Sequence, residues 1–161
     1  MRGVGSKCYA QDVDYKAYTL FVYNFMKYVE WPEAQSKGDF TVGIFGDSPI
    51  QKELQVLASG KKLRGRNIVI KSISKPEDAV NCQLLYISSS KSSQFKQLKE
   101  QMKDKPILFV GEREGLAKKG AALSFVTMED DELKFDINKK EIETRQLKIA
   151  SSLISLGILV N

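Results

Sequence analysis

Residues 15–32 read YKAYTLFVYNFMKYVEWP and predict a helix that other elements must surround. On a helical wheel of about 100° per residue, the polar side chains fall in one narrow stripe made of Lys16, Thr19, Asn24, Lys27 and Glu30. Apolar side chains cover well over half of the circumference, so most sides of this helix should contact protein. We expect the helix to end at Trp31-Pro32, because a residue that precedes proline is disfavoured in the α region.

Short apolar runs alternate with helical patterns after this first helix. We predict strands at 40–45, 67–73, 82–88 and 106–110, and helices at 49–59 and 94–103. The order strand, helix, strand, strand, helix, strand favours parallel pairing with helices on both faces. The predicted fold class is therefore α/β, with a mixed, mostly parallel sheet.

The last third of the chain predicts a hairpin and a terminal helix. Two apolar runs, 123–128 and 133–137, flank the acidic residues 129–132, which suggests a hairpin at the edge of the sheet. Asn138, with Glu141 three residues later, is a capping signal for a helix that continues to the C-terminal end. We expect this last helix to pack beside the first one, so that the terminal helices share one core.

Length and composition indicate one globular domain. The chain has 161 residues, of which 42% are hydrophobic and 28% charged, and we predict a single domain at 12–161. The net charge is +5, but acidic residues lie between many of the lysines. We interpret these lysines as a solvated surface and predict no nucleic-acid partner.

The chain lacks the residues on which most classes of catalytic and metal-binding sites depend. The chain contains no histidine and only two cysteines, Cys8 and Cys82, which removes histidine bases, Ser-His or Cys-His nucleophile pairs and cysteine-rich metal clusters. The acidic run 129–132 lacks the spaced ligands of a calcium loop. The segment 43–48 lacks the ending of a phosphate-binding loop. We predict a protein that is not an enzyme and uses neither a metal nor a cofactor.

The N-terminal segment has features of a trimmed export signal. Residues 8–10 read CYA and resemble the small-residue end of a cleavage site, so we interpret 1–11 as a residual leader without fixed structure. Near the other end, 147–160 is strongly apolar but too short to span a bilayer. We therefore predict an exported chain that does not itself cross the membrane.

A charged loop is the main candidate for a binding site. It covers 112–120 and follows the carboxyl end of a predicted strand, which is where ligands bind in parallel α/β sheets. Its alternative role is that of a solvated connection. Trp31 is a second candidate, either as a surface aromatic or as a core anchor, and burial is the more common state for tryptophan. The candidate partner-binding residues are Glu112, Arg113, Glu114, Lys118, Lys119 and Trp31.

Five segments, taken together and in order, resemble the YfiR-like family. They are WP at 31–32, FTVGIFGD at 40–47, GEREGLAKKGAALSF at 111–125, FDIN at 135–138 and LKIASSL at 147–153. The resemblance extends from about Tyr15 to the C-terminal end. Ala121-Ala122 departs from the family pattern, in which glycines and an apolar residue are usual, and the paired cysteines of some members are absent.

The resemblance implies a non-catalytic regulator. Members of the family are exported, mostly periplasmic bacterial proteins, and the best-understood type represses a YfiN-type membrane diguanylate cyclase by binding its periplasmic sensor part. Others act beside sensor kinases, and many form homodimers. A second class stays open at this point, namely a solute-binding module or enzyme that uses the loop 112–120. Converging acid and base groups in a pocket would favour that class, whereas an exposed apolar patch would favour the regulator.

Overall fold

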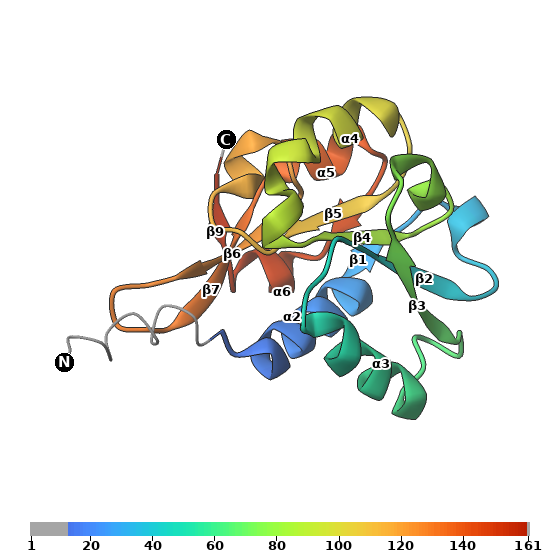
Figure 1. Cartoon of the computed structure of the whole chain (residues 1–161), viewed down its shortest axis with the longest axis horizontal. Helices are drawn as coiled ribbons and strands as arrows, with labels where there is room; N and C mark the ends of the chain where they lie inside the picture. Colours follow the sequence, from blue (N-terminus) through green and yellow to red (C-terminus); the bar gives the residue numbers. More distant parts are fainter. Residues whose placement is uncertain (1–12, 161) are drawn as a thin grey trace.

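A seven-stranded sheet forms the centre of the protein (Figure 1). In this computed structural model, which describes residues 13–160, the strand order is β3-β2-β4-β5-β6-β7-β9. The bounds are β2 (Phe40–Phe45), β3 (Ile68–Ile73), β4 (Leu84–Ile87), β5 (Leu108–Gly111), β6 (Leu123–Thr127), β7 (Leu133–Ile137) and β9 (Ile158–Leu159). Pairing is parallel from β3 to β6 and again between β7 and β9, while β6 and β7 form an antiparallel hairpin. The predicted mixed, mostly parallel sheet is confirmed.

Helices cover both faces of this sheet. They are α2 (Tyr15–Tyr28), α3 (Ile50–Gly60), α4 (Phe95–Gln101), α5 (Lys139–Thr144) and α6 (Ser151–Ile154), with 3-10 turns η1 (Glu33–Gln35), η2 (Pro76–Ala79), η3 (Ser89–Gln94) and η4 (Leu116–Lys119). Successive strand residues point to opposite faces. On β4, Leu84 and Tyr86 join the core beneath α2 and α3, whereas Leu85 and Ile87 join the core beneath α4 and η4. Two hydrophobic cores therefore enclose the sheet.

The first helix forms as the apolar pattern predicts, with differences at its edges. The Asp14 carboxylate caps α2 by accepting a hydrogen bond from the Ala17 amide at 3.1 Å. Thr19 belongs to the predicted polar stripe but is buried, because its hydroxyl donates to the Tyr15 carbonyl at 2.7 Å. The helix ends at Tyr28. The next two residues form β1 (Val29–Glu30), which pairs antiparallel with β8 (Lys148–Ile149).

The predicted continuous helix from 138 to the C-terminal end is wrong. Asn138 does cap a helix, α5, but Gln146 has a φ of 65°, a left-handed conformation that ends helical winding. The chain then forms β8, the single helical turn α6 and finally β9 beside β7. The pairing of β8 with β1 and of β9 with β7 satisfies backbone groups that a helix would have bonded internally. The last helical turn, α6, does pack against α2.

The predicted leader at 1–11, which contains Cys8, lies outside the described residues. Within 13–160, every helix is too short or too polar to cross a lipid bilayer.

Candidate functional site

The loop after β5 lies at the carboxyl ends of the parallel strands. β2 leads through α3 to β3 on one side, whereas β4 leads through α4 to β5 on the other side. The crevice between two strands whose connections diverge in this way is the usual ligand position in α/β sheets. Residues that follow β2, β4 and β5 therefore meet at one end of the sheet.

Glu112 joins the ends of these three strands. Its carboxylate accepts hydrogen bonds from the Ser48 hydroxyl at 2.6 Å, the Tyr86 hydroxyl at 2.7 Å and the Ser89 amide at 2.8 Å. Its side chain is turned inward, and the residue is only 9% exposed. Burial, reinforced by the nearby Glu112 carboxylate, raises the pKa of Tyr86 far above its usual value, so Tyr86 stays a neutral donor. The sequence pattern did not reveal this role, because Ser48 and Tyr86 are distant from Glu112 in the chain.

Burial also raises the pKa of Tyr18, on the neighbouring helix α2, to about 12. Its ring stacks on Phe125 with centroids 4.0 Å apart. This stacking holds α2 against the hairpin formed by β6 and β7.

The backbone of the loop 112–120 is fixed at several points. Gly115 and Gly120 have φ angles of 92° and 111°, which side chains disfavour. Between them, the Ala117 backbone N–H donates to the Ser124 hydroxyl at 2.9 Å, and the Ala117 carbonyl accepts from the side-chain amide of Asn138 at 2.9 Å. Asn138 thus clamps the loop in addition to capping α5. We call the loop 112–120, whose backbone these hydrogen bonds hold, the platform.

Four of the six predicted binding residues are exposed on this platform. They are Arg113, Glu114, Lys118 and Lys119. Beneath them, Asp136 on β7 is 5% exposed. Burial raises the pKa of the Asp136 carboxyl, the positive charge of Lys118 lowers it, and the negative charge of Glu114 raises it further; the net shift is upward.

Trp31 is a core anchor, as the more common alternative for tryptophan suggested. It is 8% exposed, and its indole N–H donates to the Gln83 carbonyl at 2.9 Å. Its ring packs edge-on against Phe40 at a centroid distance of 5.0 Å. Because Phe40 begins β2, Trp31 lies at the opposite end of the sheet from Glu112. The structure therefore does not bring Trp31 together with the charged loop.

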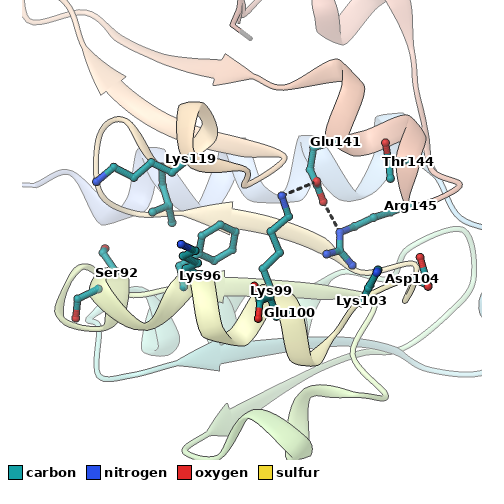
Figure 2. A pocket seen from close by; sticks show the side chains of 13 residues that line it. Ser92, Lys96, Lys99, Glu100, Lys103, Asp104, Lys119, Glu141, Thr144 and Arg145 are labelled. Carbon is teal, nitrogen blue, oxygen red and sulfur yellow. Dashed lines mark hydrogen bonds and ion pairs between the residues drawn. The ribbon is translucent and has the colours of Figure 1, made fainter.

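An open groove of about 1030 Å³ adjoins the platform. It lies between α4, η4 and α5, and Figure 2 shows Lys119 across the groove from the side chains of α4. At its inner wall Glu141 forms ion pairs with Lys99, at 2.9 Å, and with Arg145. Arg145 also donates to the carbonyls of Met102 and Lys105, each at 2.9 Å.

The described acidic side chains and Cys82 were the remaining candidates for metal and thiol chemistry. Between residues 13 and 160, no three His, Cys, Asp or Glu side chains are grouped so that they could hold a metal ion. Cys82 is 4% exposed, and burial raises the pKa of its thiol to about 11, so it is protonated near neutral pH.

Comparison with known proteins places this geometry in a family. A search of curated proteins gave no significant match. A family model described as YfiR/HmsC-like matches residues 15–158, which includes the platform, the groove and the sheet as far as Ile158. The chain therefore belongs to the YfiR/HmsC-like family.

Proposed function

We propose that the protein is an exported, periplasmic and non-catalytic regulator that binds the sensor domain of a membrane diguanylate cyclase or sensor kinase. Membership of the YfiR/HmsC-like family is the observation that carries this proposal. A regulator of this kind needs only a difference in affinity between the two states of its partner. The working unit is the single domain 12–161, and a second copy of the chain is an alternative partner.

The platform made of 112–120 is the proposed contact surface. Its backbone is fixed by the Glu112 and Ala117 hydrogen bonds, so binding would cost little conformational entropy in this loop. The exposed charges of Arg113, Glu114 and Lys118 can select and orient a partner of complementary charge. Glu112 and Trp31, being buried, are left out of the proposed surface.

Several large apolar side chains are available at the surface for contacts with a partner. Leu20 on α2, Val56 on α3, Leu156 after α6 and Leu159 on β9 are each 58–64% exposed. Leu156 follows α6, the helical turn that packs against the helix carrying Leu20. Protein interfaces combine such apolar contacts with a charged rim.

Calorimetric titration with the purified sensor domain of a membrane cyclase or kinase encoded nearby tests the proposal. We expect Arg113→Glu combined with Lys118→Glu to weaken binding about tenfold or more, because two exposed cations become anions. Arg113→Glu alone is a second variant, which keeps Lys118 and therefore leaves the positive charge near Asp136 unchanged. The matched control, Lys37→Glu with Lys62→Glu, reverses two exposed lysines that precede β2 and β3, at the opposite end of the sheet.

The control should bind like the wild type. Absence of any complex with the wild-type protein would overturn the regulator proposal. Equal binding by wild type and the platform variants would instead show that the contact surface lies elsewhere.

Export has its own test. Fractionation of cells that express the complete gene should place the protein outside the cytoplasm. A wholly cytoplasmic protein would contradict the periplasmic assignment.

A further inference from the structure

The groove beside the platform combines a net positive charge with apolar surface. Lys96 projects from α4, Lys103 follows the C-terminal end of that helix, and Lys119 lies on the opposite wall in η4 (Figure 2). Among the described residues, none of these three lysines forms an ion pair. Phe95 and Leu116 contribute the apolar part of the lining.

The carboxylate at the inner wall does not cancel this positive charge. Glu141 is already paired with both Lys99 and Arg145, so these three side chains together carry a net charge of +1. The exposed lining adds three lysines and two acids, Glu100 and Asp104, which is again +1. The groove as a whole therefore has a net charge of +2, and its ion-paired wall is fixed by the bonds from Arg145 to the Met102 and Lys105 carbonyls.

One polar atom in the groove has no internal partner. The Ser92 hydroxyl oxygen is shielded from solvent, yet it makes no hydrogen bond within the described structure. Buried polar groups are nearly always hydrogen-bonded, and a bound molecule is one way to satisfy such a group. Ser92 lines the groove, so a change of its side-chain rotamer would let this hydroxyl donate a hydrogen bond to a ligand there.

We propose that this groove binds a small organic anion, with an apolar body against Phe95 and Leu116 and a carboxylate or phosphate attracted by the positively charged lining that includes Lys96, Lys103 and Lys119. Its volume of about 1030 Å³ is at the upper end of the range for small-molecule sites. The assignment of a ligand site stands apart from the proposed regulator function. Leu116 and Lys119 belong both to the groove and to the platform, so a bound ligand would change partner binding. This regulatory effect, unlike the ligand site itself, rests on the proposed function.

The test uses the full chain and the fluorescent anion 8-anilinonaphthalene-1-sulfonate. Its neutral analogue N-phenyl-1-naphthylamine lacks the charge and serves as the matched probe. We expect Lys96→Glu with Lys103→Glu to weaken sulfonate dye binding roughly fivefold or more, and the same binding to weaken as salt rises from about 20 to about 500 mM. The neutral analogue should bind more weakly and respond to neither change. Both lysines lie outside the proposed partner surface, so partner binding measured on the same variant should persist.

Amide chemical shifts locate the dye. Shifts at Ser92, Lys99, Leu116 and Lys119 support the site, and displacement of the dye by 1-naphthoate or by 1-naphthyl phosphate identifies the preferred anionic group. The proposal is overturned if the shifts map to other elements, if the charge reversals leave dye binding unchanged, if the neutral analogue binds as tightly, or if neither naphthyl anion competes. If the wild type formed no complex with the sensor domain, the regulator function would be refuted, but the dye results would still support the ligand site.

Discussion

Removal of one hydroxyl from the Glu112 cluster should measurably destabilise the fold. Tyr86 is 0% exposed, and its hydroxyl donates to the Glu112 carboxylate at 2.7 Å. Tyr86→Phe keeps the ring and opens no large cavity, so the change isolates a buried hydrogen bond to a charged group. Such bonds contribute about 1.5–3 kcal/mol. For a chain of this size we expect the midpoint of thermal unfolding to fall by about 3–12 °C.

Urea unfolding followed by the fluorescence of Trp31, the one tryptophan of the chain, measures this loss. The matched control is Tyr23→Phe, because the Tyr23 hydroxyl donates to the neutral Lys62 carbonyl at 3.2 Å in an exposed setting. The control should change the free energy of unfolding by less than about 0.5 kcal/mol. Equal effects of the two substitutions would refute the role of Glu112 in joining the strand ends.

Three further predictions concern buried groups. Phe25→Ala removes a ring with 0% exposure and should cost about 3–5 kcal/mol in urea unfolding, whereas exposed Lys16→Ala should stay within about 0.5 kcal/mol of wild type; similar losses would contradict the assigned core face. The pKa of Asp136 is raised above its ordinary 3.8, so its contribution to stability is complete below that value and is lost as pH rises through the folded pKa. Asp136→Asn should therefore raise the free energy of unfolding at pH 7 and leave it unchanged near pH 3. A lower free energy of unfolding for the variant than for wild type at pH 7 would contradict this prediction. Cys82, studied in a Cys8→Ser background, should react with Ellman's reagent only after unfolding, because its thiol is buried and has a pKa of about 11; rapid labelling of the folded protein would contradict this burial.

The parallel sheet was predictable because its signals are local. Continuous apolar runs such as 84–87 indicate strands buried on both faces, and the intervening helical patterns imply crossovers. The hairpin of β6 and β7 followed from the acidic turn between two apolar runs. These elements depend on hydrophobic periodicity, which the sequence displays directly.

The C-terminal region depended on contacts that the sequence does not display. Its apolar residues have helical spacing, but β8 pairs with β1 and β9 pairs with β7, each across more than 20 residues of chain. Only Gln146, in a left-handed conformation, marks the end of α5, and glutamine carries no strong turn signal. Tertiary pairing therefore overrode the local helical pattern.

The position of the candidate loop in the fold could be predicted from the sequence, whereas the orientation of its side chains could not. The position of the loop at the carboxyl end of a strand follows from the fold rule for parallel sheets. The sequence does not show which of its charges face solvent, because the inward turn of Glu112 depends on Ser48, which follows β2, and on Tyr86 in β4. The groove likewise needs α4, η4 and α5 in their folded positions.

The output of the partner enzyme in living cells is the most direct measure of regulation. In a strain that lacks the gene, the intracellular cyclic-di-GMP level, or the phosphorylation level if the partner is a kinase, should be high. Complementation with wild type or with Lys37→Glu and Lys62→Glu should lower it, whereas Arg113→Glu with Lys118→Glu should leave it high while the variant accumulates as a folded protein. An output that is the same in the deletion strain and in all complemented strains would contradict the regulatory account.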